Sequence, residues 1–189
     1  MRIISGRFRG RVLTSFQADH IRPTTDRVKE TLFNKWMHHI DGARVLDLFS
    51  GTGSLGLEAL SRGAQHVQFV EMNLKSIDIL KKNIALLKLD PSEYSILKSD
   101  VIGFLKKYKG EPFDLILADP PFTEKMAHDV MQAMDSSACF KPETLIAIES
   151  QKKERMDEKY SQLYRYDMND YGDKVLSFFT KKGEDTSNV

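Results

Sequence analysis

Short apolar segments that alternate with stretches of helical spacing limit the fold of this chain more than any other feature. The apolar segments cover residues 44–49, 66–71, 94–98, 113–119 and 144–149, and helical spacing lies between them at 55–62, 74–87 and 125–134. Strands separated by helices predict a mostly parallel sheet covered on both faces. Residues 163–168 and 174–179 flank a polar turn and predict an antiparallel pair at one edge of the sheet.

The 189 residues predict one domain with two appendages. We expect a basic N-terminal hairpin arm at 1–22, an α/β body at 23–180 and a disordered polar tail at 181–189. In the body, a first helix follows Pro23, with Val28, Leu32, Trp36 and Ile40 at helical spacing. One cysteine and five histidines without ligand spacing predict no metal site. The sequence has no apolar run of membrane-spanning length and indicates a cytoplasmic protein.

The arm concentrates positive charge in a chain whose net charge is only +1. Residues 1–11 contain four arginines and no acidic residue, and they are Arg2, Arg7, Arg9 and Arg11. Such a run indicates either a polyanion contact or a solvated surface hairpin. Residues 2–6 and 8–13 predict two short strands. A hairpin this short contributes little to a hydrophobic core, so we expect that deleting residues 1–13 leaves a folded body.

A tetrapeptide, Asp119-Pro120-Pro121-Phe122, follows the fourth apolar segment. It therefore lies where a strand of an open α/β sheet ends and ligands bind. The prolines remove two N–H donors and leave carbonyls that only accept hydrogen bonds. An exocyclic amine can donate to Asp119 and to the Pro120 carbonyl while its ring stacks on Phe122. The alternative is an Asp-Pro turn with Phe122 in the core.

The loop after the first segment contains Gly51, Gly53 and Gly56, which formally match the dinucleotide fingerprint, with Glu71 twenty residues after Gly51. This pattern keeps an NAD-dependent oxidoreductase open. Asp47 argues against it, because a carboxylate at this strand end repels a pyrophosphate and attracts the cationic groups of S-adenosylmethionine. Glu71 would then accept hydrogen bonds from the two ribose hydroxyls. Asp100 and the Val101 N–H suit the adenine.

With these residues in view, the sequence resembles the RsmD-type bacterial methyltransferases, which modify the exocyclic N2 of a guanine in 16S ribosomal RNA. The resemblance covers nearly the whole chain. Its most specific parts are residues 2–6, residues 22–34 and residues 47–53. The tetrapeptide is shared with amino-group methyltransferases in general and supports the chemistry more than the substrate; family members mostly carry tyrosine at the position of Phe122. It implies a Rossmann-like class I methyltransferase fold with a seven-stranded sheet, S-adenosylmethionine as methyl donor, and an RNA-binding N-terminal hairpin.

Residues and resemblance together give the predicted site. The catalytic residues are Asp119, Pro120 and Phe122. The cofactor contacts are Thr24, Asp47, Phe49, Gly51, Gly53, Glu71, Asp100, Val101 and Asp119. The RNA contacts are Arg2, Arg7, Arg9, Arg11 and Arg22, and the resemblance places Arg22, Thr24 and Thr25 along the site.

The predicted partner is 16S rRNA, free or within an assembling small subunit, and the predicted protein is a monomer with no metal and no membrane contact. Two alternatives of other classes stay open. One is an amino-group methyltransferase that acts on DNA adenine or on a protein glutamine. The other is a non-catalytic RNA-binding protein with the same fold.

Overall fold

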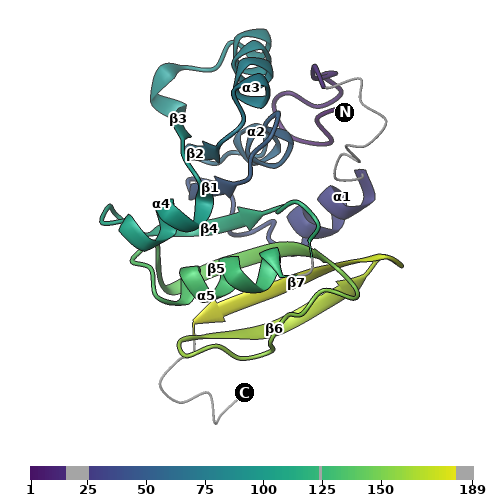
Figure 1. Cartoon of the computed structure of the whole chain (residues 1–189). Coiled ribbons are helices and arrows are strands. Elements are labelled where there is room, and N and C mark those ends of the chain that lie inside the picture. Colours follow the sequence, from purple (N-terminus) through teal and green to yellow (C-terminus); the bar gives the residue numbers. More distant parts are fainter. Residues whose placement is uncertain (16–25, 124, 182–189) are drawn as a thin grey trace.

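A twisted seven-stranded sheet runs through the protein, as seen in a computed structural model that describes residues 1–15, 26–123 and 125–181 (Figure 1). The strand order is β3-β2-β1-β4-β5-β7-β6. Strands β1 to β5 are parallel, and β7 is antiparallel to both β5 and β6. The strands are β1 (Arg44–Leu48), β2 (His66–Glu71), β3 (Tyr94–Lys98), β4 (Phe113–Ala118), β5 (Phe140–Gln151), β6 (Leu163–Asp170) and β7 (Lys174–Lys181). This arrangement confirms the predicted fold class.

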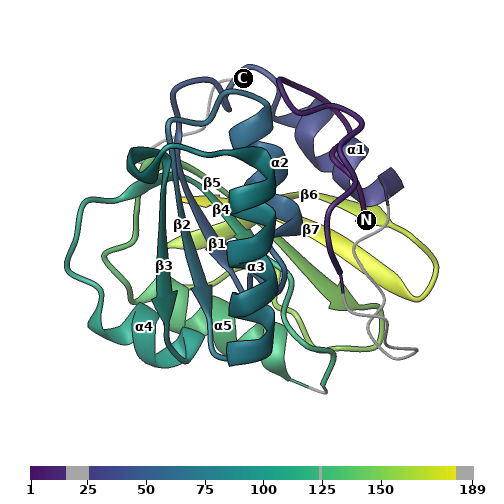
Figure 2. The same ribbon diagram turned by 90° about the horizontal axis from the view of Figure 1, so that it is seen from above.

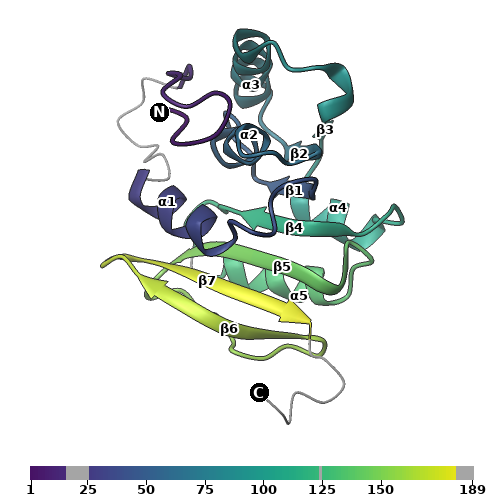
Figure 3. The same ribbon diagram turned by 180° about the vertical axis from the view of Figure 1, so that it is seen from behind.

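Helices cover both faces of the sheet, with α1, α2 and α3 on one side and α4 and α5 on the other (Figures 2 and 3). Local signals set several of their ends. The side chain of Asn73 accepts hydrogen bonds from the backbone of the first turn of α3, and Asp100 does the same for α4. The helices are α1 (Asp26–Lys35), α2 (Ser54–Ser61), α3 (Leu74–Leu87), α4 (Val101–Lys107) and α5 (Met126–Asp135), with a short 3-10 turn at Pro91–Glu93.

Alternate side chains of the central strands enter two separate cores. In β1, Val45 packs under α1–α3, whereas Leu46 and Leu48 pack under α4 and α5. In β4, Leu117 faces the first core and Ala118 the second. The period of two places Asp47, Glu71 and Asp119 on the same face as α1, α2 and α3. The predicted acids therefore share one side of the sheet.

The predicted elements of the body match the structure closely, with three main differences and shifts of a few residues at some strand ends. Helix α4 was not predicted, since its seven residues include a glycine and carry little periodic signal. Strand β5 begins at Phe140, earlier than the predicted residue 144. Helix α1 ends at Lys35, although Trp36 and Ile40 beyond it are almost fully buried. Within the described ranges, no helix combines the length and apolar character needed to cross a bilayer.

The N-terminal arm differs from its prediction in two ways. It folds back on itself through a single isolated bridge between Arg2 and Val12 rather than through two strands. It is also part of the first core, because Ile3 and Leu13 are 0% and 3% exposed. Gly6, with φ of 83°, lies so close to the end of α2 that a Cβ there would stand 1.7 Å from the Ser61 carbonyl oxygen.

The arm also carries much of the hydrogen bonding around α2. Glu58 of α2 is fully buried and accepts from the backbone N–H groups of Ile4 at 2.8 Å and Ser5 at 3.0 Å. The Lys29 ammonium is equally buried, lies 3.6 Å from Glu58 and donates to the Arg2 carbonyl. These contacts count against the prediction that the body folds without residues 1–13, because the arm satisfies a buried ion pair.

Candidate functional site

The carboxyl ends of β1 and β4 meet at the point where the strand order reverses. From β1 the chain proceeds outward to β2 and β3 and then returns to β4 on the other side. The Asp119 N–H, just beyond β4, donates to the Leu48 carbonyl at the end of β1 across 3.5 Å. In open α/β sheets, ligands bind outside the strand ends at this switch point. The loop 49–53 and the tetrapeptide both lie there.

The loop after β1 has an unusual backbone. Phe49 has φ of 57°, and Gly51 and Gly53 have φ of 53° and 90°. A bulky aromatic residue rarely adopts this left-handed conformation, and such strain concentrates at ligand sites. The Gly51 N–H donates to Glu71 Oε2 at 2.8 Å, which ties the loop to the end of β2. A Cβ on Gly51 would meet no other group closer than 3.8 Å, so the backbone is open to a close approach there.

Glu71 connects the ends of β1, β2 and β3. Its Oε1 accepts from the N–H groups of Met72 and Asn73, and its carbonyl accepts from the Ser99 N–H after β3. The carboxylate is only partly buried and has further acceptor capacity. Asp100 is exposed and caps α4 through the Gly103 N–H at 2.7 Å. Glu71 and Asp100 therefore stand at neighbouring strand ends.

Asp47 is placed differently from what its position suggested. It is 1% exposed, and its Oδ2 accepts from the Gly56 N–H of α2 at 2.8 Å. Burial, opposed by the Gly56 hydrogen bond and helped by the nearby carboxylates of Asp119 and Glu71, raises the pKa of Asp47 to about 8. The group is therefore mainly protonated at neutral pH. Asp47 therefore does not stand open to a cation, as its position in the sequence suggested. Instead, its side chain holds α2 on the sheet.

The tetrapeptide leads away from the end of β4. Asp119 is partly buried and follows β4, which lies between β1 and β5, so it stands between the strands that carry Asp47 and Glu149. Its charge raises the pKa of both groups. Pro120 is buried, and the Phe122 ring is partly buried. The Lys174 ammonium lies 4.6 Å from the centroid of that ring. Phe122 is thus part of a charged cluster at the strand ends and is not an ordinary core side chain.

Glu149 and Lys174 lie beside the predicted site, although the sequence did not point to either of them. Glu149 lies near the end of β5, beside Asp119, and its side chain is 3% exposed. It forms an ion pair with Lys174 at the start of β7, whose side chain is 10% exposed. Burial raises the pKa of Glu149 to about 7, as does Asp119, although Lys174 opposes the rise. The sequence signal that could have identified Glu149 is its position as the acidic residue at the end of the fifth apolar segment, 144–149.

The predicted RNA contacts divide into two groups. Arg2 pairs with Asp26 at 2.9 Å, and Arg7 pairs with Glu93. Arg9 and Arg11 are exposed, and neither has an ion-pair partner among residues 1–15, 26–123 and 125–181. Arg22, Thr24 and Thr25 lie outside the described residues.

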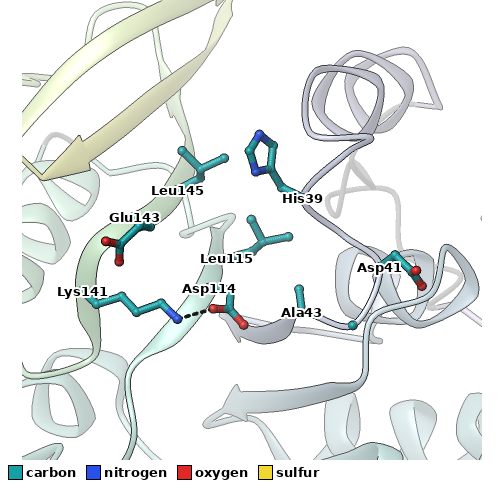
Figure 4. Close-up of a pocket in the computed structure, with 9 residues that line it drawn as sticks. His39, Asp41, Ala43, Asp114, Leu115, Lys141, Glu143 and Leu145 are labelled. Atoms are coloured by element: carbon teal, nitrogen blue, oxygen red, sulfur yellow. Dashed lines mark ion pairs between the residues drawn. The ribbon is translucent and has the colours of Figure 1, made fainter.

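A surface cavity of about 390 Å³ lies at the other end of the sheet (Figure 4). Asp114 at the start of β4 and Lys141 of β5 form an ion pair across 2.5 Å in its wall, which also contains His39 and Asp41. These residues precede or begin their strands, whereas the predicted site residues follow theirs. The cavity is therefore separate from the switch point.

The sheet order, with one antiparallel strand inserted between β5 and β6, is the class I methyltransferase form of the Rossmann-like fold. Residues 1–180 match the model of the family described as Conserved hypothetical protein 95, and the chain belongs to this family. Relatives named Ribosomal RNA small subunit methyltransferase D confirm the resemblance to RsmD-type proteins.

Individual relatives agree with this placement. A Haemophilus influenzae protein named Ribosomal RNA small subunit methyltransferase D is 40% identical over 153 residues, which cover 80% of this chain and 79% of that protein. The Escherichia coli K12 protein of the same name is 39% identical over 151 residues, covering 80% and 75%. The solved structure of yhhF from Escherichia coli superimposes with a TM-score of 0.85 at 34% identity and covers 96% of this chain and 98% of that one.

Proposed function

We propose that this protein is an S-adenosylmethionine-dependent methyltransferase that modifies the exocyclic N2 of a guanine in small-subunit ribosomal RNA. The observation that carries the proposal is the position of Asp119-Pro120-Pro121-Phe122 at the switch point, beside the strained loop 49–53. The predicted site for the methyl-accepting amine therefore lies next to the predicted site for the nucleoside part of S-adenosylmethionine. The names of the relatives support rRNA as the substrate class, and the family resemblance supports guanine N2.

The residues at the strand ends suit S-adenosylmethionine, which supplies an electrophilic methyl group when bound. Glu71 would accept from the ribose hydroxyls, and the open backbone at Gly51 permits close contact. Asp100 and the Val101 N–H would hold the adenine at the end of β3. Phe49 and Gly53 shape the loop, while Asp47 acts through α2 and does not itself need to touch the ligand.

The acceptor half of the site follows from the tetrapeptide. The lone pair of guanine N2 is delocalised into the ring, so the nitrogen is a weak nucleophile. Hydrogen bonds from its two protons to Asp119 and to the Pro120 carbonyl favour a more pyramidal, electron-rich nitrogen. Alignment alone can supply ~7–11 kcal/mol of the barrier. Formation of the N–C bond would break the methyl–sulfur bond and leave S-adenosylhomocysteine; the methylated nitrogen would then be acidic, and Asp119 would receive its proton, directly or through water.

An extruded base needs an aromatic surface, and Phe122 provides one. Stacking of a base on an aromatic side chain contributes ~1–3 kcal/mol. The basic arm supports an RNA substrate rather than a small amine, and an rRNA substrate places the activity in the cytoplasm.

The test is methyl transfer from labelled S-adenosylmethionine to 16S rRNA and to purified small subunits, followed by nucleoside analysis. We expect the label in N2-methylguanosine. Label in N6-methyladenosine or in protein glutamine would instead support the alternatives. Calorimetry should detect binding of S-adenosylmethionine and not of NAD, and the reverse result would contradict the proposal.

Arg9 and Arg11 should contribute directly to RNA affinity. Each phosphate contact contributes ~0.7–0.9 to the slope of log affinity against log salt, so replacing both arginines with alanine should flatten the slope by ~1.5. The loss should be similar for unrelated RNA, because phosphate contacts do not read sequence. Filter binding across a salt series measures both. Arg2→Ala should flatten the slope less than a single substitution at Arg9 or Arg11, since Arg2 already pairs with Asp26. An unchanged slope in the Arg9/Arg11 variant would show that the exposed arginines only aid solubility.

A further inference from the structure

Three charged side chains lie in a row on one face of the sheet, each on or next to one of three adjacent strands. Asp119 follows β4, Glu149 lies in the adjacent β5, and Lys174 lies in β7 next to β5. The register pairs Ala118 with Ile148, which places Asp119 beside Glu149. The order across the strand ends is therefore acceptor, acceptor, donor, and only the first of these belongs to the recognised tetrapeptide.

The second and third groups have hydrogen-bonding capacity to spare. Glu149 Oε1 accepts from Lys174, but the buried Oε2 has no hydrogen-bond partner within the described part of the chain. A buried acceptor without a partner costs free energy and needs an explanation. Lys174 has three N–H donors, and the hydrogen bond that its ammonium makes among the described residues goes to Glu149. The cluster thus holds one further acceptor, Glu149 Oε2, which neighbouring side chains cover and which a base reaches only when they move aside, and two further donors beside Phe122.

We propose that Glu149 and Lys174 determine the base specificity of this site by reading the Watson–Crick edge of guanine, with Glu149 accepting from N1–H and Lys174 donating to O6. This inference rests on the proposed function, because it assumes that N2 is held by Asp119. The edge of guanine presents N2–H, N1–H and O6 in a row, which is donor, donor, acceptor. That order complements Asp119, Glu149 and Lys174.

Other bases do not complement this order. Adenine held by its amine at Asp119 presents the N1 lone pair to Glu149, and cytosine presents the N3 lone pair. With Glu149 ionised by its contact with Lys174, each places an acceptor against an acceptor, which leaves buried polar groups unpaired and disfavours the complex. The tetrapeptide alone can bind amines of several kinds and does not distinguish one base from another. Glu149 and Lys174 supply that discrimination.

The position of Lys174 fits this role. Its ammonium lies over the Phe122 ring, where a stacked base would also lie. The flexible stem of lysine lets the ammonium move to the rim of a stacked base while the Glu149 contact is kept. A purely structural role is a weaker explanation, because apolar residues of similar volume often stabilise a core at least as well as a buried ion pair.

The test compares guanine with 2-aminopurine at the methylated position, once nucleoside mapping has located it in the rRNA. 2-Aminopurine keeps the N2 amine but lacks N1–H and O6. The wild-type protein should favour guanine by at least about 100-fold in kcat/KM, because a site built to hydrogen-bond a group rejects the analogue without it. In Glu149→Met/Lys174→Met, which removes both charges together, kcat/KM for guanine should fall toward the 2-aminopurine value. The 2-aminopurine value itself should stay the same.

Lys35→Met is the matched control. Lys35 also pairs with an acid, Asp167, and lies 5.2 Å from an aromatic centroid, that of Phe178, but it belongs to α1. Its discrimination should equal that of the wild type. Equal losses on both bases in the double variant would overturn the inference in favour of a ring-positioning role. If the double variant does not fold, the wild-type protein alone still tests the inference. Equal kcat/KM for guanine and 2-aminopurine in the wild type would overturn it. Absence of any methylated guanine would instead refute the proposed function.

Discussion

Replacing Asp119 with alanine is expected to lower methyl transfer to rRNA at least about 100-fold, the lower end of the effect of removing a positioned acid–base group. Asp119 stands at the end of β4, where it can accept from the target amine and then take its proton. Affinity for S-adenosylmethionine should change far less, since the ribose partner proposed here is Glu71 on β2. Single-turnover transfer and calorimetry measure the two quantities separately.

A control for this variant lies on the same strand. Asp114→Ala removes the acid at the start of β4, which pairs with Lys141 and accepts from the Arg44 N–H at the opposite end of the sheet. It should keep wild-type transfer per folded molecule. Phe122→Ala should impair transfer, whereas Phe122→Tyr keeps the stacking surface and should retain most activity. A fully active Asp119→Ala variant would mean that the tetrapeptide is only a turn.

Much of the fold was predictable because its signals are local. Apolar runs such as 113–118 are long enough to specify a buried strand, and the Asn73 side chain marks the start of α3 within three residues. The switch-point site followed from the same logic, since parallel strands bring their carboxyl ends together. The family resemblance added the substrate class, which no local signal contains.

The missed features depend on contacts between distant residues. Glu58 stands in an apolar helical stretch, where an acid is typical of the solvent face, yet the arm buries it completely. Glu149 becomes part of the site only because β7 inserts beside β5 and brings Lys174 to it. Asp47 points to an N–H nine residues later in the chain. Spacing in the sequence specifies none of these partners.

Deleting residues 1–13 should remove most or all of the stability of the fold. The deletion exposes the part of the first core that Ile3 and Leu13 cover, at ~1.5–3 kcal/mol for each side chain. It also removes the N–H donors of Ile4 and Ser5 from a buried carboxylate, and breaking the partnerships of a buried charge costs ~3–5 kcal/mol. Together these losses approach the ~5–15 kcal/mol that holds a typical domain folded.

A point substitution separates the two contributions. Glu58→Ala keeps the apolar contacts of the arm but leaves the Lys29 ammonium buried without its anion, and burial already lowers the pKa of Lys29. We expect a loss of ~3–5 kcal/mol in the free energy of unfolding, measured by denaturant titration. The Arg9/Arg11 alanine variant, altered only at exposed arm positions, should unfold like the wild type. If the deletion variant also unfolds like the wild type, the arm is a detachable appendage, and its contacts with α2 contribute nothing to the body that carries the site.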